Sequence, residues 1–402
     1  MFENIISQDA VSLLKKDLEK KCFPGAVLFC GNRGSAKLSS ALEVARLLSC
    51  QRNGSWLCDC PECLLNKALV NQNVLILGPR DCTPEISAAS ETFLNAVFKN
   101  ASYLEASRYL FIRSVRKLTS RFNQVLWKDD SNLSKIASVI SEIDENLETL
   151  DFPHKLPSSE EIQKVLEILL KLCIKLESDF LYDSIPINNI RNVSSWAHLK
   201  SKDGKKTVII ENADRMLENV RNALLKILEE PPEDTVFILT ASKKNAVMPT
   251  ILSRVRPYYF TDRSLEKQQE VIRRVFHNDG FSGTVNDFLL NYLPVKTCDI
   301  EKKAEEFLFS LKNSKIPQIS VLCKECNNFE PRIILKIFLN KLVNLERHLM
   351  KTSCGASFSF EFLNEIKKCY TNIVTFNQSI QSAFEILCKK IINLKAKYKI
   401  EL

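Results

Sequence analysis

A short apolar segment, a loop with two glycines and a lysine, and an amphipathic helix follow one another near the start of this 402-residue chain. Residues 25–30 read as a buried strand, residues 31–37 (GNRGSAK) as the loop, and the segment up to about Ser49 as the helix. A strand that enters a helix through such a loop is typical of folds in which parallel strands alternate with helices. The first fifty residues therefore predict an α/β domain.

Three more apolar runs, at 73–77, 207–210 and 235–240, extend this pattern and predict a mainly parallel sheet with helices on both faces. Between Gly78 and Gly204 lie 125 residues without glycine, and their apolar spacing is mostly helical. Within that stretch, Ser158 and Glu161 have the form of a capping box. After about residue 261 only helical patterns remain.

The loop resembles the phosphate-binding pattern G-x-x-x-x-G-K-[ST] but departs from it at two positions. Gly31 and Lys37 fit the pattern, with Gly34 at one of its free positions, whereas Ala36 replaces the glycine before the lysine and Leu38 replaces the hydroxyl residue. A leucine side chain cannot coordinate Mg²⁺. We therefore expect a nucleotide site that keeps its shape without its metal chemistry, and a plain strand-to-helix turn is the alternative.

The acidic half of such a site follows the predicted strand 207–210. Glu211 stands at the position of a metal-binding acid, but the next residue is Asn212, whose amide cannot act as a general base. The sequence therefore predicts that ATP is not hydrolysed in this site and makes bound ATP and Mg²⁺ doubtful there, although the retained Lys37 leaves ATP binding open.

Four cysteines, Cys50, Cys58, Cys60 and Cys63, fall within 14 residues. No apolar run is long enough to span a membrane and no signal peptide is recognisable, so we expect a cytoplasmic protein with reduced thiols. Clustered thiolates in that compartment suit a tetrahedral structural Zn²⁺, and buried free thiols are the alternative.

Residues 222–232 (NALLKILEEPP) resemble the N-A-L-L-K-x-L-E-E-P-P signature of bacterial DNA polymerase III clamp-loader subunits. The segments 237–240 and 250–254 (FILT and TILSR) agree with it, and the start, 2–8 (FENIISQ), resembles the opening of the family. The altered residues of the phosphate site make the chain similar to the delta-prime type, whose ATP site is degraded, rather than to the ATP-hydrolysing gamma/tau type.

The resemblance implies an α/β fold with an AAA+ type P-loop domain over residues 1–262, containing the parallel sheet, a zinc module at 50–63 and a helical insertion at about 90–183. A small helical lid domain (263–315) and an all-α C-terminal collar domain that oligomerises (316–402) would follow. Residues at about 90–183 are expected to be an insertion relative to the family. It is either a docking surface or a helical hairpin without a separate role.

The resemblance also implies a place in the five-subunit clamp loader of the DNA polymerase III holoenzyme, which closes a sliding clamp around primed DNA during replication. The expected partners are the gamma/tau and delta subunits, the sliding clamp and primer-template DNA, and no membrane. The segment 253–255 (SRV) resembles the family's Ser-Arg-Cys motif, so Arg254 is expected to enter a neighbour's ATP site as an arginine finger. A structural salt bridge is the alternative role, and Arg256 is a nearby competitor.

Two other functions stay open from the sequence: an ATP-hydrolysing gamma/tau-type motor, and a zinc-containing nucleic-acid-binding scaffold. The net charge is +8, and residues 301–402 carry +7 of it, which suits either a DNA-binding surface or solvated lysines. Four basic residues in the predicted insertion are of a kind commonly found simply exposed to solvent: Arg113, Arg116, Lys117 and Arg121.

Overall fold

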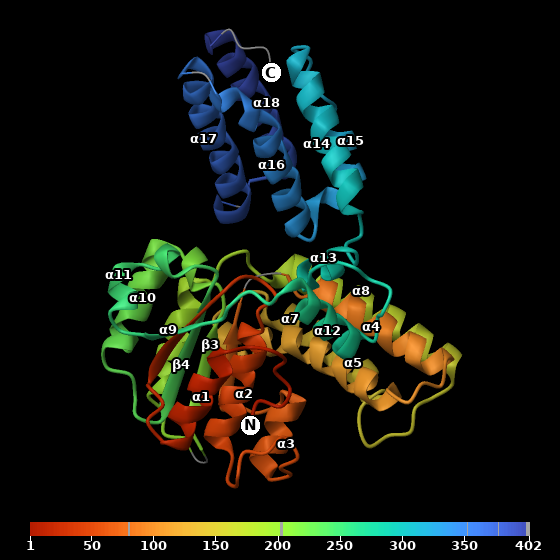
Figure 1. The fold of residues 1–402 in the computed structure, drawn as a ribbon, viewed down its shortest axis with the longest axis vertical. Coiled ribbons are helices and arrows are strands. Elements are labelled where there is room, and N and C mark those ends of the chain that lie inside the picture. The colour runs from red at the N-terminus through yellow and green to blue at the C-terminus, as the bar shows by residue number, and fades with distance from the viewer. Residues whose placement is uncertain (79–80, 202–203, 352, 377, 399–402) are drawn as a thin grey trace. The chain divides into compact units, whose positions relative to one another are not determined.

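The computed structural model describes residues 1–402 except 79–80, 202–203, 352, 377 and 399–402 (Figure 1). The chain divides into two compact units, Met1–Leu289 and Leu290–Leu402. The first unit combines a sheet with helices and the second is helical. The finer division into P-loop, lid and collar domains stays a prediction.

Five parallel strands form one sheet in the order β2-β3-β4-β1-β5. They are β1 Ala26–Cys30, β2 Val74–Leu77, β3 Lys206–Ile210, β4 Thr235–Ala241 and β5 Arg256–Tyr259. The sequence predicted the first four. It missed β5, because this edge strand contains a proline and buries only Tyr258, so no apolar run marks it.

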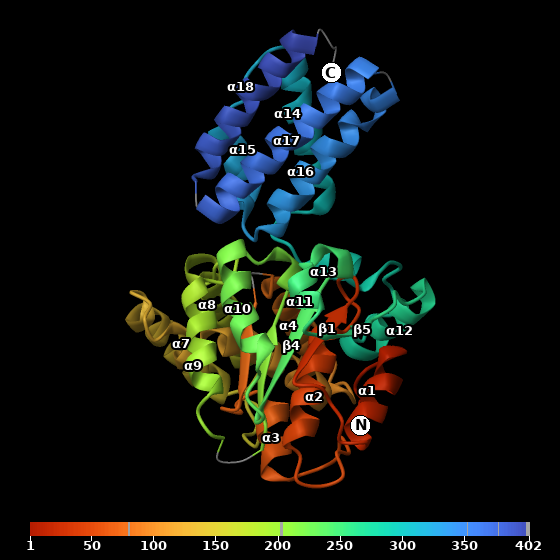
Figure 2. The ribbon, with the colours of Figure 1, turned by 90° about the vertical axis from the view of Figure 1, so that its left-hand side faces the viewer.

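Side chains alternate between the two faces of the sheet and build two cores. Helices α1 (Ala10–Glu19) and α2 (Lys37–Ser49) cover the face that presents Val27 and Phe29, whereas α9 (Ile187–Ala197) and α10 (Glu218–Glu229) pack on the other (Figure 2). The expectation of a parallel sheet with helices on both faces is therefore confirmed. Parallel sheets need this cover because both faces are apolar.

A group of helices lies between β2 and α9, where the insertion was expected: α4 Thr83–Phe98, α5 Leu104–Thr119, α6 Gln124–Trp127, α7 Leu133–Glu148 and α8 Ser159–Phe180. Their apolar sides join the core of the α10 face. Helix α8 begins with the predicted capping box, in which Ser158 and Glu161 bond each other's backbone amides. The described residues of these helices thus form part of the first unit, and whether they are an insertion relative to the family stays a prediction.

A buried carboxylate fastens α8 to the start of α4. Glu177 accepts hydrogen bonds from the backbone amides of Asp81 and Thr83, at 2.7 and 2.8 Å, and from the Thr83 hydroxyl at 2.6 Å. Burial raises the pKa of Glu177, while the Thr83 hydroxyl works against that rise. These bonds satisfy amides at the start of α4 that have no partner within the helix, so they tie α8 to the start of α4.

The other helices of the first unit are α3 Pro61–Ala68, α11 Pro249–Leu252, α12 Leu265–Phe276 and α13 Val285–Leu290, whose last residue falls in the second unit. The second unit continues with α14 Thr297–Lys312, α15 Ile319–Glu325, α16 Ile333–Leu345, α17 Ser353–Phe376 and α18 Ile380–Tyr398. Its core contains stacked and edge-on rings of Phe307, Phe329, Phe338 and Phe384. No described helix is both long and apolar enough to cross a membrane.

Candidate functional site

The glycine loop lies at the carboxyl end of β1, between that strand and α2. A Cβ atom on Gly31 would stand 2.4 Å from the carbonyl oxygen of Phe260, so only glycine fits beside the end of β5. Gly34 has a φ of 80°. Ala36 also adopts the left-handed conformation, with a φ of 65°, at the position where the pattern has glycine. The loop therefore has the backbone turn that glycine would favour despite the alanine.

Lys37, the first residue of α2, points back into its own loop. Its Nζ donates to the carbonyl oxygens of Gly31 at 2.5 Å and Asn32 at 2.7 Å. Burial lowers the pKa of Lys37 to about 8, although the nearby Glu211 and Asp214 oppose this shift. Among the described residues, no carboxylate is within salt-bridge distance of Lys37.

Lys37 should make the free energy of unfolding depend on pH. The ordinary pKa of 10.5 falls to about 8 on folding, so the folded state carries a penalty of about 3 kcal/mol below pH 8 that disappears as the pH rises toward 10.5. Lys37→Met should therefore raise the free energy of unfolding by up to about 3 kcal/mol near pH 7, and by progressively less above pH 8. Urea unfolding at several pH values measures this, with the exposed Lys15→Met as control; a gain that does not change with pH would contradict it.

The acid of the site stands directly after β3. The amide of Glu211 bonds the carbonyl oxygen of Leu77 at 2.8 Å, and the next residue, Asn212, has a φ of 53°. The Asn212 amide donates to the hydroxyl of Thr240 at 3.1 Å, which ties this segment to β4. Because the strands are parallel, their carboxyl ends bring the predicted Gly31, Gly34, Lys37 and Glu211 to one edge of the sheet.

An arginine that follows α5 forms an ion pair with this acid. Arg121, in the 3-10 turn Ser120–Phe122 after α5, pairs with the Glu211 carboxylate and also donates to the carbonyl oxygen of Lys117. Its side chain is only 5% exposed. The two residues are 90 positions apart in the sequence. Sequence reasoning grouped Arg121 with solvated basic residues, so its place in the site was missed.

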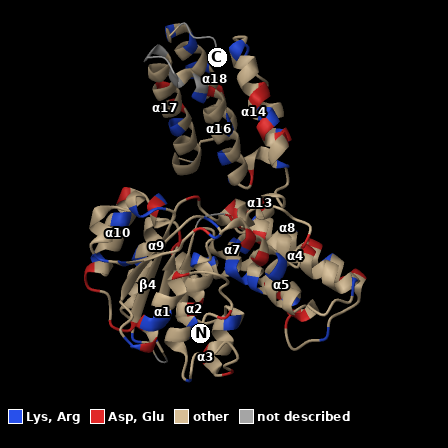
Figure 3. Ribbon diagram, viewed as in Figure 1, with Lys and Arg blue, Asp and Glu red and all other residues tan. Residues whose placement is uncertain are grey.

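The other basic residues of that stretch are also bonded within the first unit. Arg116 pairs with Asp151, Lys117 pairs with Glu85 of α4, and Arg113 donates to the carbonyl oxygen of Lys67 at 2.5 Å. Figure 3 shows the basic residues of α5 beside acidic residues of neighbouring helices. The expectation that this stretch is simply solvated is wrong, because its charges fix α5 to α3 and α4.

A cavity of about 350 Å³ opens at this edge of the sheet. The glycine loop, the ends of β3 and β4, and helices α4, α5, α12 and α13 all line it. One part of the wall is apolar and includes Ile6, Val271 and Phe276, and another part is charged. Apolar walls with a few convergent polar groups are typical of ligand sites.

Arg254 lies at the opposite end of the strands, beside the start of β1. It lines an open cavity of about 530 Å³ together with Gly25 and Ala26, at the start of β1. Five residues of extended strand, about 16 Å, separate that end of β1 from the glycine loop. Arg254 therefore lies far from the phosphate site of its own chain.

In the described chain Arg254 has partners of its own. Its Nη2 lies 2.7 Å from Oε1 of Glu229, and its Nη1 donates to the carbonyl oxygen of Thr250 at 2.7 Å. The arginine side chain is 30% exposed and the glutamate 53%. The competitor, Arg256, pairs with the buried Asp17 at 3.0 Å. Arg254 is thus held by an exposed acid, which is a weak restraint.

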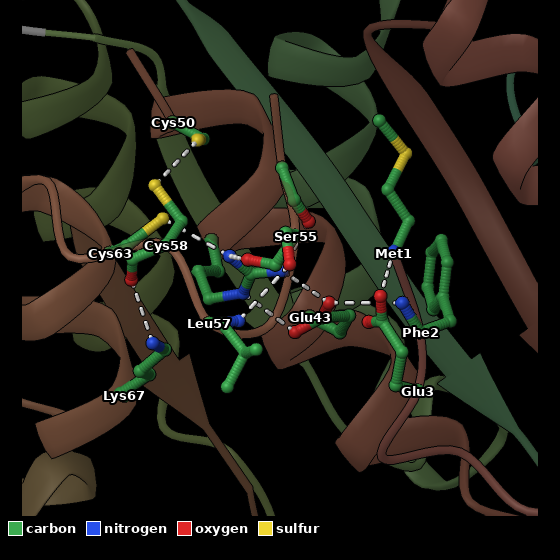
Figure 4. A network of polar contacts seen from close by, with 12 residues as sticks. Met1, Phe2, Glu3, Glu43, Cys50, Ser55, Leu57, Cys58, Cys63 and Lys67 are labelled. Atoms are coloured by element: carbon green, nitrogen blue, oxygen red, sulfur yellow. Dashed lines mark hydrogen bonds and ion pairs between the residues drawn. The ribbon is translucent and has the colours of Figure 1, made fainter. Parts of the chain in front are cut away.

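The four clustered cysteines meet at the end of α2 and the start of α3. The sulfur atoms of Cys50, Cys58, Cys60 and Cys63 all lie within 4.8 Å of one another. The Sγ atoms of Cys50 and Cys58 are 3.8 Å apart (Figure 4), and sulfurs about 2.3 Å from a shared tetrahedral ion would be about 3.8 Å apart. The four thiols could therefore hold one metal ion, and thiolate ligands favour zinc.

A buried ion pair supports this cluster from α2. Arg46 pairs with Glu43 at 2.6 Å and also approaches Sγ of Cys63 at 3.1 Å. Its remaining donors bond the carbonyl oxygens of Gly54 and Ser55, at 2.9 and 3.0 Å. The guanidinium thereby shapes the loop that carries the second and third cysteines and offers positive charge to the thiolates.

The remaining described cysteines form no comparable group. Cys323 and Cys326, which have C-x₂-C spacing but no second pair beside them, are buried in the helical core of the second unit. Burial raises the pKa of both thiols, that of Cys326 to about 11. They behave as small apolar core residues.

A family model described as "DNA polymerase III, delta subunit" matches residues 6–128 and 139–264, more than half of the chain. The DNA polymerase III subunit delta' of Pseudomonas aeruginosa is 49% identical over 80 residues, 20% of this chain and 24% of that protein. The DNA polymerase III subunit gamma/tau of Mycobacterium bovis is 31% identical over 91 residues, 23% of this chain and 15% of that protein. These matched segments span at most about a quarter of those relatives.

A crystal structure of a DNA polymerase III gamma subunit-related protein from Thermotoga maritima overlaps 96% of this chain and 100% of that one. The sequence identity is 13% and the TM-score is 0.32. A score of this size does not establish that the two chains share their arrangement in space.

Proposed function

Because this chain belongs to the DNA polymerase III, delta subunit family, we propose that it is a clamp-loader subunit of the delta-prime type. It would assemble with gamma/tau and delta subunits in the cytoplasm and help to place the sliding clamp on primer-template DNA. The segments shared with subunits named delta' in Pseudomonas aeruginosa and gamma/tau in Mycobacterium bovis support this assignment. The helical second unit would serve in assembly.

The ion pair between Arg121 and Glu211 is the observation that carries the assignment to a non-hydrolysing subunit. A nucleotide-hydrolysing site uses its acid to hold Mg²⁺, and here a buried guanidinium takes that carboxylate. Leu38 and Asn212 supply neither a metal ligand nor a general base. The site is then a structural remnant of an ATPase centre, and ATP turnover belongs to neighbouring subunits.

The position of Arg254 supports a contribution to such a neighbour. It lies at the edge of the sheet away from its own glycine loop and is partly exposed. A guanidinium offered to a neighbour's γ-phosphate would stabilise the charge that develops during hydrolysis. The four cysteines would hold a structural Zn²⁺, since thiolates already fill all four positions.

Assembly without intrinsic ATPase activity tests this function. The purified full chain should release no phosphate from ATP above background, because the acid and base positions are both compromised. Mixed with gamma/tau and delta subunits from the same source, it should elute with them as one complex that hydrolyses ATP when clamp and primed DNA are added. Failure to enter that complex would contradict the assignment.

The alternative motor function has one observation in its favour, the retained Lys37 at the head of α2. A Lys37→Met variant distinguishes the two functions within the assembled loader. A non-hydrolysing subunit predicts nearly unchanged ATPase activity of the complex. A motor subunit predicts the loss of one active site, since a lysine at this position reaches the β- and γ-phosphates.

A further inference from the structure

The cavity at the glycine loop carries more positive than negative charge. Three carboxylates line it, and each lies within salt-bridge distance of a cation: Asp81 with Arg33, Glu85 with Lys117, and Glu211 with Arg121. Three further cations line the same wall, Lys37, Arg215 and Arg263. No described carboxylate in the cavity is left to balance them. A cavity with this excess favours an anion.

The extra cations are held in place by neutral groups. Arg263 donates to the carbonyl oxygens of Ile6 at 2.9 Å and of Gly34 at 2.8 Å, and its side chain is buried. Lys37 donates to carbonyl oxygens of the loop. Carbonyl oxygens orient a cation without cancelling its charge, so both groups can still attract an anion.

Arg121 has donors to spare beside Glu211. A guanidinium carries five N–H groups, and only two are engaged, with the Glu211 carboxylate and the Lys117 carbonyl oxygen. Its Nε is shut off from solvent and faces Gly78, 3.1 Å from where a Cβ of that residue would stand, so the donors left for a ligand are those of Nη1 and Nη2. A phosphate oxygen in the cavity could therefore bond Arg121 while the ion pair with Glu211 persists.

We propose that this cavity binds the phosphate groups of a nucleotide without a divalent metal ion, with the guanidinium of Arg121 in the role that the metal plays in a hydrolysing site. The inference deepens the degenerate site of the proposed function and rests on it. The apolar wall of Val271, Val275 and Phe276 suits a base or ribose at the other end of the ligand.

Divalent metal is disfavoured by the same groups. Mg²⁺ needs near-octahedral oxygen ligands, and Leu38 provides none. The Glu211 carboxylate forms an ion pair with Arg121, whose positive charge repels a second cation. Asp214, the other acid of this segment, accepts a hydrogen bond from the Ser242 hydroxyl and does not line the cavity. We therefore expect the negative charge of bound phosphates to be balanced by cations of the chain rather than by Mg²⁺.

Calorimetric titration of the full chain with ADP, in EDTA and in excess Mg²⁺, tests the proposal. Wild type should bind ADP in EDTA, and Mg²⁺ should change Kd by no more than about threefold, a small effect on the free-energy scale. Arg121→Gln should weaken binding in EDTA by about tenfold to a hundredfold, as expected for a lost hydrogen bond to a charged group. In that variant Mg²⁺ should strengthen binding, because Glu211 is released.

Three further variants separate this result from misfolding or from binding elsewhere. Arg116→Gln removes a matched arginine of α5 that pairs with Asp151 outside the cavity, and should bind as wild type does. Glu211→Gln keeps Arg121 in place and should strengthen binding in EDTA, because a negative charge near the phosphates is lost. Lys37→Met should weaken binding in both buffers.

Several results would overturn the proposal: no ADP binding in EDTA, binding that requires Mg²⁺, loss of binding in Glu211→Gln, or no effect of Lys37→Met. Circular dichroism of each variant checks folding, and if Arg121→Gln does not fold, Glu211→Gln and Lys37→Met decide. Elution with gamma/tau and delta subunits is measured separately. Failure of ADP to bind in EDTA would thus refute the metal-free site and leave the clamp-loader assignment unaffected.

Discussion

Replacing Arg254 with alanine should slow ATP hydrolysis at the site facing this subunit in the assembled loader by about 1000-fold or more, the effect expected for removal of an arginine finger. Clamp loading on primed DNA should fall with it. In the separate chain Arg254 pairs with Glu229 at 2.7 Å. An exposed pair of this kind contributes at most about 1 kcal/mol, so a neighbour's γ-phosphate would readily draw the guanidinium away.

Phosphate release and clamp loading by reconstituted loaders measure this effect. The matched control is Arg256→Ala, two residues further along the chain. This variant breaks the ion pair between Arg256 and Asp17 and should leave both rates near those of wild type. Arg254→Lys should recover little, because an ammonium group lacks the planar fork of donors. If an Arg254→Ala loader assembles normally and hydrolyses ATP at the wild-type rate, Arg254 is not an arginine finger and its role is the structural salt bridge with Glu229.

The parts of the fold that follow from local pattern were predictable. Buried parallel strands are continuous apolar runs, which is why β1, β2, β3 and β4 could be placed to within about two residues, whereas the proline-containing edge strand β5 was missed. The glycine loop and Glu211 could be placed together because carboxyl ends of parallel strands share one edge. The cysteine cluster was predicted from spacing alone and its sulfur atoms do meet.

Arg121 shows what local pattern does not give. It is brought to Glu211 by a turn 90 residues away, and no rule of spacing links them. A signal was nevertheless present, since Arg121 stands three residues after the buried Leu118 and directly before the buried Phe122. A buried cation needs hydrogen-bond acceptors, which a carboxylate or backbone carbonyl oxygens can supply. The apolar neighbours of Arg121 therefore indicate that it has acceptors inside the fold, but not that one of them is Glu211.

The second large effect is expected at the cysteine cluster. Cys60→Ser should lower zinc from about one ion per chain to near zero, because a tetrahedral structural site needs all four thiolates. Cys60 is almost fully buried at the start of α3. Structural zinc binding contributes to folding free energy directly, so we expect Tm to fall by about 10 °C, corresponding to a loss of a few kcal/mol in a unit of this size.

The loss should spread beyond the loop because other elements are bonded to this module. Tyr109 and Arg113 of α5 both bond the carbonyl oxygen of Lys67 in α3, at 3.0 and 2.5 Å, and Glu43 bonds the amide of Phe2 at 3.1 Å. Hydrogen exchange should therefore speed up in α3, in α5 and near the N-terminus, but not in the second unit.

Elemental analysis measures the zinc content, and hydrogen exchange measures the loss of protection. The control is Cys22→Ser, which removes an exposed thiol outside the cluster. Wild-type protein that contains no zinc, or a Cys60→Ser variant with unchanged Tm, would show that the four thiols are ordinary core residues.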